Sequence, residues 1–134
     1  MEISNLQKLK IAKIAKKFHL KLIVVFGSFA SGKNRVDSDL DIAILGIKEI
    51  SFSEQINLIN EFSRVFNKNI DLSILNNVNP LLFFEVSKNS ILLYGSREDF
   101  LKFKLYAFKV YNDYTPYFEM EKNLNKKIIN AYAH

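Results

Sequence analysis

Cysteine is absent from the 134-residue sequence, and histidine occurs only twice. A chain without cysteine has neither disulfides nor thiolate metal ligands. His19 and His134 stand far apart in the sequence, which argues against an imidazole metal site. The sequence also contains no apolar run of 18 residues and no signal-peptide core at its N-terminus. We therefore expect a cytoplasmic protein that has no membrane partner.

Glycine and proline are scarce, with four and two copies, and repeats, low-complexity tracts and linkers are missing. Apolar residues make up 49% of the chain, which is enough for a hydrophobic core. We expect residues 1–134 to form a single domain, with a core over about 20–95 and a helical C-terminal tail over 96–134.

The apolar pattern predicts alternating helices and strands. Capping boxes at Ser4 and Ser51 begin helices that end near Lys17 and Asn67, the first with an apolar stripe of Leu6, Leu9, Ile14 and Phe18. Strands are predicted over 20–26, 40–45, 69–75 and 90–94. A short helix starts at Asn79-Pro80, and a long helical region follows Ser96, where Pro116 is expected to kink or divide it. The order indicates an α/β domain.

Positive charge is in excess, because the formal net charge is +5 and lysine is frequent near the N-terminus. Such a stripe attracts phosphate or nucleic acid. No base-reading motif accompanies it, so we interpret it as a solvated helix face and do not expect direct nucleic-acid binding. The lysines are Lys8, Lys10, Lys13, Lys16, Lys17 and Lys21.

Two aspartates stand at the start of the second predicted strand. Asp39 and Asp41 share one face of that strand, because successive side chains point to opposite faces. Two adjacent carboxylates repel each other unless a cation lies between them. Oxygen ligands alone select magnesium or manganese. The pair therefore predicts a divalent-metal site, and Asp71 in the third strand is the candidate for a third acid.

A Gly-Ser pair closes the first predicted strand. Gly27 allows the backbone to approach a ligand closely, and Ser28 adds a hydroxyl donor at the start of a short helix expected over 28–31. Lys33 and Arg35 bring positive charge to the following loop. This arrangement suits a phosphate, and together with the acids it predicts a metal-bound triphosphate.

These residues resemble the signature of the DNA polymerase β-type nucleotidyltransferase superfamily: Gly27-Ser28, ten residues, Asp39-Leu40-Asp41 and the later Asp71. The chain is most similar to the minimal nucleotidyltransferase (MNT) branch, whose members include MntA-like antitoxins encoded beside HEPN-domain toxins. The resemblance extends from about Leu20 to Gly95, and the tail YNDYTPYFEMEKNL is similar to that of HEPN-paired members. It implies a polymerase β-like fold with a small mixed sheet flanked by helices.

The resemblance also implies a role for each motif residue. Asp39 and Asp41 bind Mg²⁺, most simply two ions, and Asp71 is the third metal ligand or the base. Gly27 and Ser28 hold the β- and γ-phosphates of ATP. Many relatives have arginine where this sequence has Phe29 and Ser31, so Lys33 or Arg35 is left to neutralise the leaving pyrophosphate.

The implied reaction is transfer of AMP from ATP to a hydroxyl of a HEPN toxin, with a tyrosine as the expected acceptor, within a hetero-oligomer that neutralises the toxin. One alternative is a small-molecule nucleotidyltransferase of the aminoglycoside-modifying kind. Another is a non-catalytic antitoxin that covers its partner with the aromatic tail, since Tyr and Phe are favoured in interface centres. The chain is too short for the fingers and thumb of a polymerase.

Overall fold

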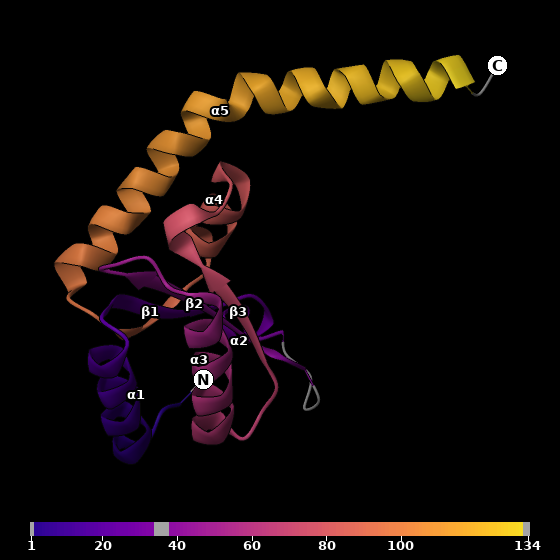
Figure 1. The fold of residues 1–134 in the computed structure, drawn as a ribbon. Coiled ribbons are helices and arrows are strands. Elements are labelled where there is room, and N and C mark those ends of the chain that lie inside the picture. The colour runs from indigo at the N-terminus through magenta and orange to yellow at the C-terminus, as the bar shows by residue number, and fades with distance from the viewer. Residues whose placement is uncertain (1, 34–37, 133–134) are drawn as a thin grey trace.

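The computed structural model describes residues 2–33 and 38–132, and Figure 1 shows its fold. Its four strands are β1 (Leu20–Phe26), β2 (Leu40–Gly46), β3 (Ile70–Ile74) and β4 (Ile91–Tyr94). They form one sheet in the order β3-β2-β1-β4. β1 runs antiparallel to β2 and β4, whereas β2 and β3 are parallel. The small mixed sheet is thus confirmed.

Two helices lie side by side on one face of the sheet, as Figure 1 shows: α1 (Asn5–Lys17) and α3 (Phe52–Phe66). Both begin at the predicted capping boxes, in which Ser4 and Ser51 each accept a hydrogen bond from the backbone N–H three residues on. The inward side chains of β1 and β2 pack against both helices. The fully buried members of this core include Ile11, Ile23, Val25, Leu40, Ile42, Ile44, Leu58 and Phe62.

The predicted apolar stripe of α1 is wrong in part. Leu6 and Leu9 are 62% and 63% exposed, whereas Ile11, which the stripe left out, is fully buried. Residues two apart on a helix differ by about 200° in direction, so Leu9 and Ile11 point almost oppositely and only one of them can face the sheet. The helix buries Ile11 together with Ile14 and Phe18.

The other face of the sheet is covered by α4 (Pro80–Lys88) and by the first part of α5 (Arg97–Tyr132). A 3-10 turn, η1 (Leu75–Asn77), links β3 to α4, and the short α2 (Ser28–Ser31) follows β1. A second hydrophobic cluster lies between this face and the helices. Its buried members are Leu22, Val24, Ala43, Leu75, Val86 and Phe103.

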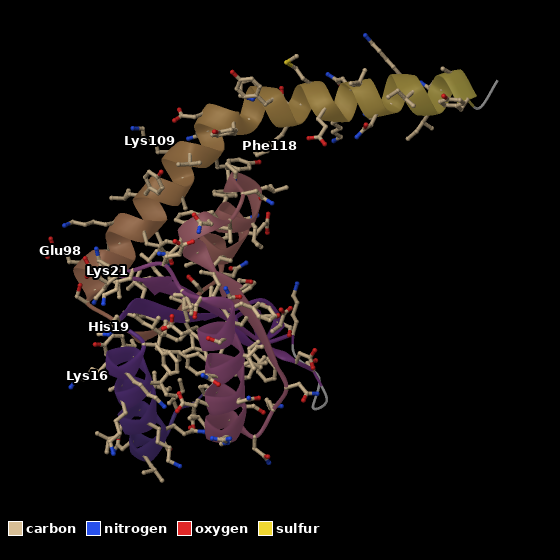
Figure 2. All side chains as sticks on the ribbon, viewed as in Figure 1. Lys16, His19, Lys21, Glu98, Lys109 and Phe118 are labelled. Carbon is tan, nitrogen blue, oxygen red and sulfur yellow. The ribbon has the colours of Figure 1, made fainter. Side chains whose placement is uncertain are left out.

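Helix α5 is continuous through Pro116, so the proline bends the helix without dividing it. Figure 2 shows the axis changing direction between Lys109 and Phe118, the interval that contains Pro116. Proline has no N–H for the helical hydrogen bond and its ring crowds the preceding turn. Figure 1 shows that the distal part of α5 runs away from the sheet, and its residues 119–132 are all exposed. Across the described ranges, no helix, α5 included, is long and apolar enough to cross a membrane.

Candidate active site

The chain turns sharply at Gly27, between β1 and α2. Gly27 has a φ of +72°, a conformation that side chains with a Cβ rarely adopt. A Cβ at this position would also collide with the carboxylate of Asp41, since it would lie 3.1 Å from Cγ and closer still to Oδ2. Gly27 thus brings the backbone directly against the Asp41 side chain, which only glycine permits.

The predicted short helix at residues 28–31 is confirmed as α2. Ser31 N–H donates to the Gly27 carbonyl at 3.1 Å, and Lys33 N–H donates to the Ser28 carbonyl at 2.9 Å. Amides in the first turn of a helix have no carbonyl partner within that helix. The Ser28 hydroxyl and the backbone amides of the first turn of α2 therefore follow directly after Gly27, beside Asp41.

The predicted third acid, Asp71, lies beside Asp41. Asp41 on β2 is the register partner of Asp71 on β3, because the parallel strands align Leu40 with Ile70. The Asp41 and Asp71 carboxyl groups share a hydrogen bond. Leu40 and Ile70 point the other way, into the first core cluster, as the alternation of strand side chains predicts.

The electrostatics of Asp41 reflect this crowding. Burial raises the pKa of the Asp41 carboxyl, and the charge of Asp71, the hydrogen bond to Asp71 and the charge of Asp39 raise it further. Asp39 itself is exposed. Among the described residues, no three carboxylate, imidazole or thiolate groups converge as a ready-made metal site. Asp39 thus acts on Asp41 through its charge, while Asp41 and Asp71 are the pair in contact.

These donors fit a hard divalent cation. Asp41 and Asp71 offer carboxylate oxygens alone, the ligands that Mg²⁺ prefers. The raised pKa of Asp41 has repulsion between neighbouring carboxylates among its causes, and a cation between them would reverse that repulsion. The site is therefore chemically suited to Mg²⁺.

Three positively charged residues concern the surroundings of α2: Lys33 and Arg35, which follow it in the chain, and Lys68, which precedes β3. Lys33 is exposed just after α2, and Arg35 lies outside the described residues. Sequence reasoning missed Lys68, whose Nζ lies 4.8 Å from the ring centroid of Phe29 on α2. Its position just before the strand of Asp71 was the available signal, because that strand was already expected to lie beside the site.

Asp41 should also limit the stability of the metal-free protein. A carboxyl whose pKa is raised on folding binds its proton more tightly in the folded state, so its contribution to stability declines as pH rises above the ordinary value of 3.8. In EDTA at pH 7, Asp41→Asn should therefore raise the melting temperature by about 2 °C. The gain should vanish near pH 3.8, whereas Asp113→Asn on α5 should change nothing. A gain that grows as pH falls would contradict this.

The fold and the site together are those of the nucleotidyltransferase class: a Gly-Ser turn follows β1, and the paired acids lie on β2 and β3, the next two strands of the sheet. The family profile described as "Polymerase beta, Nucleotidyltransferase" matches residues 9–99, and the chain belongs to this family.

Two curated relatives are similar to this chain over 80 and 82 residues. The chain is 28% identical over 80 residues to protein adenylyltransferase MntA of Shewanella oneidensis, covering 60% of the chain and 58% of that relative. It therefore matches less than two thirds of the length of MntA. It is 30% identical over 82 residues to a Methanocaldococcus jannaschii protein, MJ0435, named as a candidate protein adenylyltransferase, covering 61% and 87% of the two chains.

Solved structures share the fold along almost the entire chain. A toxin–antitoxin crystal structure with AMP-PNP matches with a TM-score of 0.70 at 22% identity, covering 95% of this chain and 98% of the other. A complex of tri-AMPylated Shewanella oneidensis HEPN toxin with MNT antitoxin matches with a TM-score of 0.66 at 21% identity, covering 98% and 100%. The polymerase β-like fold is thus confirmed, and the matched region includes most of α5.

Proposed function

We propose that this chain is an antitoxin that transfers AMP from ATP to a hydroxyl of a cognate HEPN toxin. The observation that carries the proposal is the contact between Asp41 and Asp71, directly beside the Gly27 turn. It is supported by the names of the two curated relatives, both of which refer to protein adenylyltransferase activity. It is further supported by the structural match to an MNT antitoxin bound to an AMPylated toxin.

The site residues have distinct proposed roles. The backbone at Gly27 and the Ser28 hydroxyl hold the β- and γ-phosphates of ATP, and Lys33 and Lys68 add positive charge around α2. Lys33 or Arg35 neutralises the leaving pyrophosphate. Asp39, Asp41 and Asp71 would hold Mg²⁺, and we expect two ions. Bound there, Mg²⁺ supplies charge stabilisation for the attacking and leaving oxygens.

The proposed step is a single displacement at the α-phosphorus. The acceptor hydroxyl oxygen forms a bond to this phosphorus while the bond to the bridging oxygen of the pyrophosphate breaks. The hydroxyl proton passes to the Asp71 carboxylate when Asp71 acts as base, or to water when Asp71 serves only as a ligand. Pyrophosphate leaves beside Gly27 and Ser28, and AMP remains on the acceptor.

The distal part of α5 supplies a surface for the toxin. Its large apolar side chains are exposed. An exposed apolar face on a helix that projects from a domain is typical of an interaction site. The face is rich in aromatic residues and methionine, which are enriched at interfaces. We assign contact with the toxin to Tyr117, Met120, Leu124, Ile128 and Tyr132, which are 65%, 67%, 57%, 46% and 87% exposed.

Neutralisation of the toxin in cells tests whether catalysis is needed. The double variant Asp39→Asn/Asp41→Asn should fail to rescue growth when the cognate toxin is induced, because it retains the toxin-binding surface of α5 and loses the acids. Co-purification with the toxin should be unchanged, which serves as the control for folding and binding. Full rescue by this variant would show that the chain neutralises its partner by covering it.

A further inference from the structure

The three parts of the site lie in order across the sheet. Gly27 directly follows β1, Asp41 lies on β2 and Asp71 lies on β3, and these strands are neighbours in the order β3-β2-β1. Figure 1 shows β3 at the margin of the sheet beside β2. The paired acids therefore lie between a triphosphate held at Gly27 and the outer edge of β3.

Given the proposed function, this order sets the direction from which the acceptor arrives. In an in-line displacement, the attacking and leaving oxygens lie on opposite sides of the phosphorus. The leaving pyrophosphate lies on the β1 side, at Gly27 and Ser28. The acceptor hydroxyl must then enter from the β3 side, where Asp71 is exposed.

The backbone groups on the outer edge of β3 have no strand partner within residues 2–33 and 38–132. Leu40 N–H donates to the Asn69 carbonyl at 2.9 Å, and the N–H and C=O groups of successive residues alternate between the two edges of a strand. The backbone groups of Ile70, Leu72 and Ile74 therefore point outward.

Apart from the charge of Asp71, β3 lacks the common features that block an exposed edge. Exposed edge strands usually carry proline, lysine or a bulge that prevents pairing with another chain. The strand Ile70–Ile74 has neither proline nor lysine, and its register with β2 is regular along all five residues. Such an edge can accept an extended segment through main-chain hydrogen bonds.

We propose that the acceptor segment of the partner protein binds in an extended conformation, paired with the outer edge of β3. Pairing places the hydroxyl-bearing side chain beside Asp71. Because side chains alternate, the residues two before and two after the acceptor lie on the same face, and one of them faces Ser73, which is half-buried. The chain would thus select an accessible extended stretch of its partner.

Substitutions at Leu72 test this pairing. Leu72→Pro removes an outward N–H, which an edge strand tolerates, and Leu72→Ala removes the side chain but keeps that N–H. We expect Leu72→Pro to raise the KM for the cognate HEPN toxin at least tenfold relative to Leu72→Ala. Affinity for a non-hydrolysable ATP analogue should be equal in the two variants. Equal KM values for the toxin would overturn the inference.

Amide hydrogen exchange on the wild-type protein is a second, independent test. It needs no substitution, so it can be carried out even if Leu72→Pro does not fold. With toxin and the ATP analogue bound, exchange at Leu72 and Ile74 should slow at least tenfold, and unchanged exchange would overturn the inference. Turnover by the wild type separates the two proposals. A wild-type protein that transfers no AMP would overturn the proposed function and this inference with it, whereas normal turnover without protection overturns only the pairing.

Discussion

Asp41→Asn is expected to lower the rate of AMP transfer to the toxin by on the order of 10³-fold. Asp41 lies between the Gly27 turn and Asp71, so it touches both the phosphate side and the acceptor side of the site. Asparagine keeps the shape of the side chain and removes the charge that would hold Mg²⁺. The measurement is transfer of label to the toxin from ATP labelled in the α-phosphate.

The control for Asp41→Asn is Glu49→Gln, which removes one exposed carboxylate from the loop after β2. This variant should transfer AMP at the wild-type rate. The Asp41→Asn protein should remain folded, because the substitution relieves repulsion in the metal-free state. Transfer within tenfold of the wild type would show that Asp41 is not required for the chemistry.

Gly27→Ala is expected to cause the second large loss, in both nucleotide binding and stability. At a φ of +72° and a ψ of −146°, a combination adopted almost only by glycine, any residue with a Cβ is strained by about 1–3 kcal/mol. The added methyl group would also displace the Asp41 carboxylate, and overpacking of this kind costs about 1–3 kcal/mol more. We expect affinity for ATP to fall at least tenfold, as measured by calorimetry, alongside a lower free energy of unfolding.

Gly32→Ala provides a control without the collision, because Gly32 also has a positive φ but lies in the left-handed helical region, with a ψ of 12° where Gly27 has −146°. Its φ is +76°, but a Cβ there would meet no atom within 4 Å. The variant should show the strain of about 1–2 kcal/mol alone. If Gly27→Ala and Gly32→Ala lose equal stability and bind ATP equally, the close approach of Gly27 to Asp41 has no functional role.

Local signals in the sequence predicted most of the fold. The capping boxes at Ser4 and Ser51 located the starts of two helices, because each satisfies backbone groups within a few residues. The β-branched run before Gly27 located β1, and the alternation around Asp71 correctly placed that acid on the face opposite Ile70. Such signals depend on neighbouring residues, so they can be read without knowledge of the fold.

Features that depend on distant contacts could not be read in this way. The sequence alone does not show that Asp41 and Asp71 align in register, because strand order is set by packing of the entire sheet. The position of Lys68 over Phe29 joins segments 39 residues apart, and the burial of Ile11 in preference to Leu9 depends on how α1 is rotated against the sheet. The roles of Lys33 and Arg35 stay predictions.

The most direct test is the intact mass of the cognate HEPN toxin after incubation with this protein, ATP and Mg²⁺. We expect a mass increase by one or more whole AMP units, absent with EDTA and absent with the Asp39→Asn/Asp41→Asn variant. Fragmentation should place the added group on a hydroxyl side chain. An unchanged toxin mass, with a stable complex formed equally by wild type and variant, would rule out adenylylation and show that the protein acts by binding alone.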